Sequence, residues 1–344
     1  MKIAIDAMGG DFAPKAVVEG TLKAAERYPE IQFILFGPED VVREHLTVEK
    51  ENISIHHAPM AIKVTDSPVK AVRTQKDSSL VMAAQAVKDG EADALMSAGN
   101  TGAVLTAGLL LIGRMKGIDR PGLMATIPSF SGDHPYTILT DAGANVDCKV
   151  KNLVQFAELA TLYQEKVFGL KDVKVGLLNN GTEEGKGNSL TKAAFQLLKD
   201  SSHLDFVGNV EARDILTTSC PVIVGDGFVC NAVLKSFEGT ALTLMKAIKG
   251  AIKSGPLSAQ IGGLLIKKPL KNLLKQVNYD QIGGAVLLGI KAPLIKAHGS
   301  SNPVAIASAL DQTVQMLTSG LIPAINQRLE ELASKNEADE VKED

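Results

Sequence analysis

A repeated phrase constrains the fold of this chain more than any other feature: a short apolar strand, a loop rich in glycine, asparagine and serine, and then a helix. The phrase recurs along the chain, as KIAID before AMGGDFA, ADALMSA before GNTG, KVGLLN before NGTEEGKGN, PVIVGD before GFVCN and GIKAPLIKA before HGSSN. Such alternation predicts a mostly parallel sheet with helices on both faces. Because ligands bind where strand carboxyl ends meet helix N-termini, we expect these loops to converge on one crevice.

Composition excludes several classes of protein. The 344 residues and 45% hydrophobic content fit one large or two ordinary α/β domains. Aromatic residues make up only 4% and the net charge is -3, so we expect no nucleic-acid partner. Three cysteines without CxxC spacing favour a reduced cytoplasm, and the N-terminus begins as a strand rather than a signal peptide. The most apolar helix candidate, 103–112, is too short for a membrane span.

The first loop, DAMGGD, places two aspartates, Asp6 and Asp11, around a Gly-Gly pair. It fails the dinucleotide fingerprint, because no third glycine follows Gly9 and Gly10 at the G-x-G-x-x-G spacing. A Gly-Gly pair after a strand most often forms only a tight turn, and the aspartates could equally cap the next helix. The loop predicts close backbone approach but no NAD site.

The loop NNGTEEGKGN resembles a P-loop without meeting its requirements. The motif needs glycine at the Asn180 position and Ser or Thr at Gly187, so we exclude ATP. Lys186 remains in a glycine-rich loop before a helix, a combination suited to an anion. A solvated surface lysine is the alternative.

Two further loops offer polar groups at a helix entrance. HGSSN places Ser300, Ser301 and Asn302 directly before a helix, so hydroxyl, carboxamide and free backbone N–H groups face one point and favour phosphate. Ordinary capping by Asn302 is the alternative, although it explains one polar residue and not the others. SAGNTGA offers a similar entrance through Asn100 and Thr101.

The sequence contains no motif typical of a metal site or of a covalent acyl-enzyme. The six histidines show no zinc-binding spacing, no G-x-S-x-G elbow occurs, and no cysteine has the setting of a nucleophile. We therefore expect no metal site. If the reaction is acyl transfer, the acceptor itself must attack.

One segment, 239–279, departs from the alternation, because it contains seven lysines and no acidic residue. Apolar residues at helical spacing predict a basic amphipathic helix, and SGPLSAQIGG before it predicts a helical hairpin over about 238–278. Such helices bind anionic bilayers, whereas an extra apolar helix pair in an α/β enzyme usually packs on a symmetry mate, so both contacts stay open. The residues expected in either contact are Leu264, Leu265, Leu270, Leu273, Leu274, Lys267, Lys268 and Lys271.

With these loops assembled, the chain resembles the bacterial phosphate acyltransferase family PlsX, from Met1 to about Leu317. The motifs that carry the resemblance are IDAMGGD, SAGNTGA, DAGANVDCK, NNGTEEGKGN, NVEARDI, GDGFVCN and KAHGSSNPVAI. Gly185 and Cys230 depart from the serine and glycine usual in the family's TEESKGN and DGFVGN. The resemblance implies transfer of a fatty acyl group from acyl carrier protein to inorganic phosphate, giving acyl phosphate for phospholipid synthesis.

The resemblance also implies an architecture similar to isocitrate and isopropylmalate dehydrogenases, with three α/β/α layers around one large, mostly parallel mixed sheet. We expect a single domain of two intertwined subdomains over 1–332, from which the hairpin protrudes. The polar, acidic residues 333–344 predict a disordered tail. We further expect a cytoplasmic homodimer, peripherally bound to the membrane, whose product goes to a membrane glycerol-3-phosphate acyltransferase.

Phosphate is already an anionic nucleophile, so its attack on a thioester needs positioning and charge control rather than a metal or cofactor. We hypothesise that Lys186 and the entrance Ser300-Ser301-Asn302 hold phosphate. Asn180, Asn231 or His298 donates to the carbonyl oxygen. The carboxylates of Asp6, Asp11 and Asp226 would repel a phosphate dianion, so we expect them to orient Lys186 or the loop N–H groups. The residues assigned to these roles are Lys186, Asn180, Asn231, His298 and Asp226 for catalysis, Gly9, Gly10, Asn100, Thr101, Ser300, Ser301 and Asn302 for phosphate, and Asp6 and Asp11 for loop orientation.

Three other functions compete with this one. A phosphate acetyl- or butyryltransferase acting on short acyl-CoA would share the phosphate loops. A metal- and NAD-dependent decarboxylating dehydrogenase would share the architecture. A noncatalytic membrane-surface scaffold would use only the lysine-rich hairpin.

Overall fold

The structure is a computed structural model that describes residues 1–277 and 283–343, and the side-chain surroundings of 1–269 and 283–334. Eleven strands form one sheet in the order β3-β2-β1-β4-β11-β10-β5-β6-β9-β7-β8. The strands are β1 (Lys2–Asp6), β2 (Gln32–Gly37), β3 (Ile53–His57), β4 (Ala94–Ser97), β5 (Gly122–Pro128), β6 (Tyr136–Thr140), β7 (Lys174–Asn179), β8 (Asp205–Glu211), β9 (Val222–Val224), β10 (Ala285–Leu288) and β11 (Leu294–Lys296).

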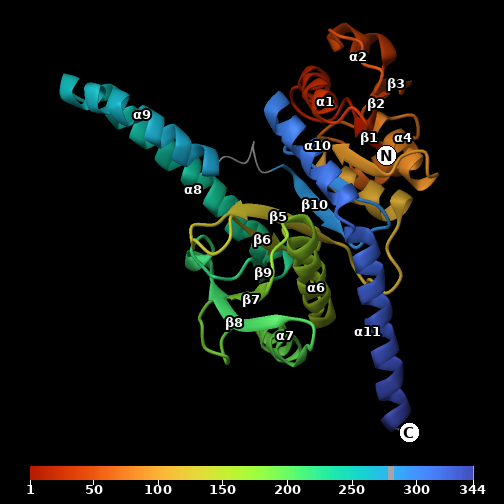
Figure 1. Ribbon diagram of the computed structural model, residues 1–344, viewed down its shortest axis with the longest axis vertical. Helices are drawn as coiled ribbons and strands as arrows, with labels where there is room; N and C mark the ends of the chain where they lie inside the picture. Colours follow the sequence, from red (N-terminus) through yellow and green to blue (C-terminus); the bar gives the residue numbers. More distant parts are fainter. Residues whose placement is uncertain (278–282, 344) are drawn as a thin grey trace.

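Helices cover both faces of this sheet, which confirms the predicted three layers (Figure 1). The apolar contacts place α1, α6, α7 and α10 on one face, and α4, α5 and the start of α8 on the other. The helices are α1 (Lys15–Arg27), α2 (Glu39–His45), α3 (Pro68–Thr74), α4 (Ser79–Lys88), α5 (Thr101–Ala107), α6 (Val150–Val167), α7 (Ser189–Asp200), α8 (Gly227–Ser254), α9 (Leu257–Val277), α10 (Pro303–Thr318) and α11 (Leu321–Glu343).

The sheet is mixed because its two parallel halves run in opposite directions. Strands β3, β2, β1, β4 and β11 are mutually parallel, as are β6, β9, β7 and β8. Between them, β10 pairs antiparallel with both β11 and β5, and β5 pairs antiparallel with β6. The strands of one half therefore end, at their carboxyl termini, on the opposite side of the sheet from those of the other half. The loops expected in one crevice form two groups, one from each half.

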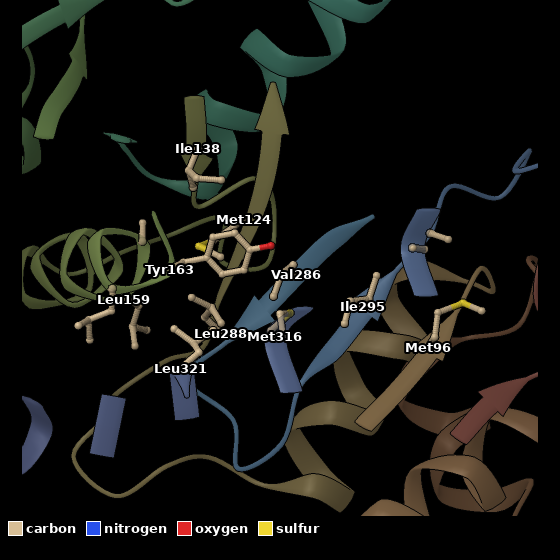
Figure 2. Packing of buried hydrophobic residues seen from close by; sticks show 14 of the residues in the cluster. Met96, Met124, Ile138, Leu159, Tyr163, Val286, Leu288, Ile295, Met316 and Leu321 are labelled. Atoms are coloured by element: carbon tan, nitrogen blue, oxygen red, sulfur yellow. The ribbon is translucent and has the colours of Figure 1, made fainter. Parts of the chain in front are cut away.

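A continuous hydrophobic core joins the two halves. It extends from Phe33 on β2 to Val175 on β7, and both side chains are fully buried. Figure 2 shows its centre, where Tyr163 of α6 lies over Met124 of β5, near Val286 of β10. The Tyr163 hydroxyl accepts a hydrogen bond from Gln312 of α10 at 2.9 Å, so the buried polar group is satisfied.

The predicted helical hairpin is present and projects from the body as α8 and α9 (Figure 1). Helix α8 begins at Gly227, earlier than expected, because the sequence placed the boundary at the last acidic residue rather than at the cap. Gly263 allows the helices to approach, since a Cβ there would lie 2.4 Å from the Ile252 side chain. Leu264 and Leu265 are 70% and 77% exposed, and Lys267 and Lys268 are also exposed. The side chains predicted at Leu270, Lys271, Leu273 and Leu274 lie outside the described ones.

Helix α11 continues through 333–343, where we expected a disordered tail. That segment, ASKNEADEVKE, contains neither glycine nor proline and is rich in good helix formers, so nothing local stops a helix begun at Leu321. Within the described ranges, no helix is both long and apolar enough to cross a membrane.

Candidate active site

Three loops that follow β1, β4 and β11 meet at one edge of the sheet, and we name residues 6–11, 97–101 and 296–302 the Asp6 loops. The Asp11 backbone N–H donates to the Gly299 carbonyl at 2.8 Å. Gly9 packs so closely that a Cβ there would lie 2.6 Å from both Asp6 Oδ2 and Gly99 N. Gly10 adopts a φ of +110°, which disfavours any other residue. The close backbone approach predicted from DAMGGD is thus made to the other two loops.

The buried carboxylate of Asp6 stabilises the Asp6 loops from inside the protein. It is only 3% exposed and accepts hydrogen bonds from the hydroxyls of Ser79 and Ser97, at 2.6 and 2.7 Å. Burial raises the pKa of Asp6, and these bonds, the Met8 N–H and the nearby Lys296 lower it only in part. Asp6 therefore faces the protein, while the Asp11 side chain is exposed.

The HGSSN turn fixes the orientation of His298. Its Nδ1 lies 3.2 Å from the Ser300 backbone nitrogen and 2.8 Å from Ser300 Oγ. Because a backbone N–H can only donate, Nδ1 is the acceptor, and a neutral His298 carries its proton on Nε2. The exposed Nε2–H can donate to a ligand. Ser301 is buried, with its N–H donated to the His298 carbonyl.

Two asparagines of the Asp6 loops cap helices. Asn302 Oδ1 accepts from Val304 N at 2.9 Å and from Ala305 N at 3.0 Å, at the start of α10. Asn100 Oδ1 accepts from Ala103 N at 3.1 Å, at the start of α5. For Asn302 the capping alternative is therefore realised. Thr101, the first residue of α5, is exposed.

A second group, the Asp141 loops, comprises residues 141–147 after β6 and 225–231 after β9. Asp141 is fully buried, and its carboxylate accepts five hydrogen bonds. The donors are the backbone N–H groups of Leu123, Gly143, Ala144 and Asn145, and the Asn145 carboxamide, at 2.6 to 3.2 Å. Burial raises the pKa of Asp141, and the hydrogen bonds oppose that rise. One buried acid thus shapes the DAGAN loop.

The two segments of the Asp141 loops interlock at Gly227. Its N–H donates to the Asn145 carbonyl at 3.0 Å, and a Cβ there would lie only 2.4 Å from that oxygen. Asp226 caps α8 by accepting from Phe228 N and Val229 N at 3.0 and 2.9 Å. Asn231 lies over Gly143, and its carboxamide has no hydrogen-bond partner in the described part of the chain. Asn231 therefore keeps a donor for a ligand.

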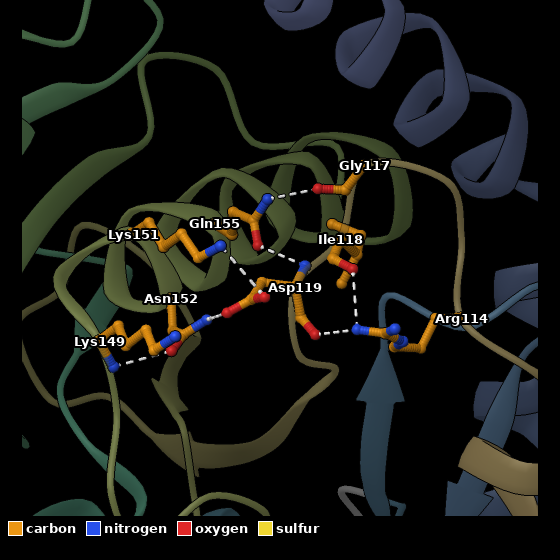
Figure 3. Close-up of polar contacts among 8 residues, drawn as sticks. All are labelled: Arg114, Gly117, Ile118, Asp119, Lys149, Lys151, Asn152 and Gln155. Atoms are coloured by element: carbon orange, nitrogen blue, oxygen red, sulfur yellow. Dashed lines mark hydrogen bonds and ion pairs between the residues drawn. The ribbon is translucent and has the colours of Figure 1, made fainter.

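The DAGANVDCK loop ends in a polar network that anchors α6 (Figure 3). Asn152 donates to Asp119 Oδ2 at 2.9 Å and accepts from Lys149 N at 2.8 Å. Lys151 pairs with Asp119 Oδ1 at 3.1 Å. Gln155 accepts from Asp119 N at 3.0 Å. These contacts fix the end of the DAGANVDCK loop that leads into α6.

The loop 179–188, here the lysine loop, lies beside the Asp141 loops because β7 pairs with β9. Asn179 Nδ2 donates to the Lys186 carbonyl at 3.2 Å and to Asn209 Oδ1 at 3.0 Å, while Asn209 Nδ2 donates to the Glu183 carbonyl at 2.8 Å. Lys186 is half exposed, with Nζ 3.9 Å from Glu183 Oε1. Asn180 is exposed beside it.

Helices α5 and α8 connect the two groups of loops. Leu105 of α5 and Ala144 of the Asp141 loops each pack against the apolar clusters of both halves. Helix α8 starts in the Asp141 loops and carries Lys235 toward Lys296. Burial lowers the pKa of Lys296 to about 8, Asp6 and Asp11 oppose this, and the positive charge of Lys235 adds to it. Among described residues, no hydrogen bond or ion pair joins Lys186 to the Asp6 loops.

Sequence reasoning missed three residues of this site. Asn209 closes the lysine loop, Asn145 completes the Asp141 cradle, and Lys296 is the one lysine among the buried side chains of the described part. For Lys296 a signal exists, since it ends an apolar strand two residues before the HGSSN loop begins. The described side chains contain no group of three His, Cys, Asp or Glu that could hold a metal ion.

Known proteins resemble the chain at two levels. A family model described as "Fatty acid synthesis protein" matches residues 1–323. Phosphate acyltransferase of Enterococcus faecalis is 49% identical over 325 residues, covering 94% of this chain and 97% of that protein. Phosphate acyltransferase of Bacillus cereus is 49% identical over 330 residues, covering 96% of this chain and 98% of that protein.

The solved structures that resemble the chain are more distant. A phosphotransacetylase from Streptococcus pyogenes has a TM-score of 0.58 at 17% identity, covering 92% of this chain and 93% of that one. A branched-chain phosphotransacylase from Enterococcus faecalis has a TM-score of 0.52 at 17% identity, covering 92% and 99%. At this identity, the likeness shows a shared fold.

Proposed function

The chain belongs to the phosphate acyltransferase family, and from that premise we propose that it transfers a long-chain fatty acyl group from acyl carrier protein to inorganic phosphate. The product is an acyl phosphate for phospholipid synthesis. The observation that carries the proposal is the 49% identity with phosphate acyltransferases over nearly the whole chain, against 17% with phosphotransacetylases. The same fold thus hosts two branches of phosphate acyl transfer, and the sequence lies with the first.

The reaction is a direct displacement. A phosphate oxygen attacks the thioester carbonyl carbon, the new C–O bond forms, and the C–S bond breaks. The thiolate leaves on the phosphopantetheine of the carrier protein and takes a proton from solvent. Because phosphate brings the nucleophilic electron pair, the protein has to position it against the thioester and to stabilise the negative charge that develops on the carbonyl oxygen.

We assign the reacting groups to the region between the Asp6 loops and the Asp141 loops, which helices α5 and α8 border. Phosphate meets the HGSSN turn, where the exposed His298 Nε2–H offers a donor next to the positive end of the α10 helix dipole. Lys186 reaches the phosphate from the lysine loop. Asn231, whose carboxamide is unused by the described residues, donates to the carbonyl oxygen. Asp226 acts indirectly, by fixing the helix that carries Asn231.

A comparison of donors tests this function. With phosphate in excess, we expect acyl phosphate, trapped as the hydroxamate, to form from palmitoyl carrier protein at least 100 times more efficiently than from acetyl-CoA. A carrier-bound long chain supplies binding energy that a short acyl group lacks. Efficient acetyl phosphate formation with no turnover of palmitoyl carrier protein would assign the chain to the short-chain branch. Phosphate-independent release of fatty acid would instead indicate a thioesterase.

The same proposal includes a membrane surface as partner of the hairpin. Its outer part carries exposed apolar side chains beside exposed lysines, an arrangement that favours anionic bilayers. Leu242 and Leu244 on α8 are 64% and 58% exposed, and Leu257, Leu264 and Leu265 on α9 are 70% to 77% exposed. A homodimer that pairs at the base of the hairpin leaves this tip available, so both contacts are compatible.

Liposome flotation measures the membrane contact. We expect the protein to float with vesicles of anionic phospholipid and the variant Leu264→Glu/Leu265→Glu to stay in the dense fraction, because two charges enter the apolar surface. The control Val48→Glu, at a residue 53% exposed and away from the hairpin, should float like the parent. If the paired variant floats normally but no longer forms dimers, the surface is a subunit interface and the membrane role is wrong.

A further inference from the structure

Lys296 occupies an unusual place for a lysine. It ends β11, between the apolar Ile295 and Ala297, and is only 7% exposed. Burying an ammonium group costs free energy unless the charge is paired. Yet within the described part of the chain Nζ makes one hydrogen bond, to the neighbouring Ala297 carbonyl, and no ion pair with a carboxylate. Packing does not explain why a lysine stands here.

Neutralising Asp6 is the simplest structural role for Lys296, and the contacts of Asp6 argue against it. That carboxylate is already held by Ser79 and Ser97 at 2.6 and 2.7 Å. Among the groups that lower the pKa of Asp6, Lys296 contributes least. Burial lowers the pKa of Lys296 to about 8 although Asp6 and Asp11 oppose it, with Lys235 adding to the fall. The surrounding protein therefore leaves the ammonium short of negative charge.

The position of Lys296 identifies the chemistry that would supply this charge. It lies two residues before His298 and at the junction where Lys235 of α8 approaches the Asp6 loops. Its backbone is fixed, because Ala297 N donates to the Ser97 carbonyl at 3.0 Å. A dianion seated at the HGSSN turn meets this ammonium and the imidazole donor together, next to the positive end of the α10 helix dipole.

We propose that Lys296 is the buried cation that binds the acceptor phosphate in this enzyme, with Asp6 as the residue that keeps its surroundings in place. The proposal rests on phosphate being the acceptor and not on the identity of the acyl donor. The proposal gives Lys296 and Lys186 different roles. Lys296 binds the ground-state phosphate from inside the Asp6 loops, and Lys186 acts from the lysine loop during transfer.

Direct phosphate binding to the full chain, without any acyl donor, tests the proposal. We expect Lys296→Met to raise the phosphate Kd about 10- to 100-fold, the loss expected for a charge-assisted contact. The midpoint of thermal unfolding should stay the same or rise, because an apolar side chain of similar length replaces an unpaired buried charge. The control Lys291→Met, at an exposed lysine before β11, should bind phosphate like the parent. A folded Lys296→Met that binds phosphate within twofold of the parent overturns the proposal.

A second measurement uses the unaltered protein and so does not depend on a variant that folds. Amine acetylation, mapped by mass spectrometry, should be at least 10-fold slower at Lys296 when phosphate is saturating, while Lys291 reacts at one rate throughout. Equal rates at Lys296 with and without phosphate would overturn the proposal. If phosphate protects Lys296 but palmitoyl carrier protein is not a donor, the inference stands and the proposed donor is wrong.

Discussion

Lys186→Ala is expected to lower kcat/KM for phosphate about 100- to 1,000-fold, the loss typical of removing one preorganised charge or donor from a transition state. Lys186 sits on a loop whose shape depends on other residues, since Asn179 and Asn209 bind the loop backbone. Among the described residues its ammonium makes one long ion pair, with Glu183 at 3.9 Å, so removing the ammonium should leave the fold intact. Initial rates measured against phosphate concentration give the effect directly.

The matched control is Lys192→Ala, which removes an exposed lysine from α7, the helix that follows the same loop. Its phosphate dependence should equal that of the parent. If Lys186→Ala also keeps the parental phosphate dependence, Lys186 is a solvated surface lysine, which is the alternative that its sequence context left open.

Asp141→Ala is expected to destabilise the protein by about 3 to 5 kcal/mol, because it leaves five buried or half-buried N–H donors without their acceptor. The carboxylate is fully buried and accepts five hydrogen bonds, of which the shortest are 2.6 and 2.8 Å from Asn145. Asp141→Asn should also be costly, since it replaces one accepting oxygen by an NH2 donor that faces the existing N–H donors. Urea unfolding at neutral pH measures both changes.

The same loop offers a control for this second prediction. Asp147 is exposed at the other end of DAGANVD, so Asp147→Ala should change the free energy of unfolding by no more than about 0.5 kcal/mol. A loss below about 1 kcal/mol for Asp141→Ala would mean that the loop finds other hydrogen-bond partners. Asp141 would then not be the residue that shapes it.

Local patterns in the sequence predicted the layers and the hairpin, whereas the mixed sheet was expected only from the resemblance to a known family. Alternating strands and helices indicate layers, and a run of lysine and leucine without acidic residues marks the hairpin. The reversal of direction between the halves is different. It arises at β10 and β5, two short apolar strands whose antiparallel pairing is set by partners 160 or more residues away along the chain. No local pattern encodes which neighbour such a strand takes.

Side-chain roles were harder to predict than loop positions. Asn302, Asn100 and Asp226 stand where polar residues were expected, yet their oxygens cap helices. Capping and ligand binding favour the same residue types at the same position, so the sequence cannot separate them. Lys296 was missed for the opposite reason. Most lysines are solvated, and only the three-dimensional position of β11 reveals a buried one.

The position of phosphate in a crystal of the full chain tests the central claim most directly. The claim is that the Asp6 loops hold the acceptor and that the Asp141 and lysine loops face it. We predict the ion within hydrogen-bond distance of the HGSSN turn and of Lys296, with Lys186 or Asn231 on its other side. Phosphate bound only among the Asp141 loops, or only at the surface lysines of the hairpin, would contradict the claim.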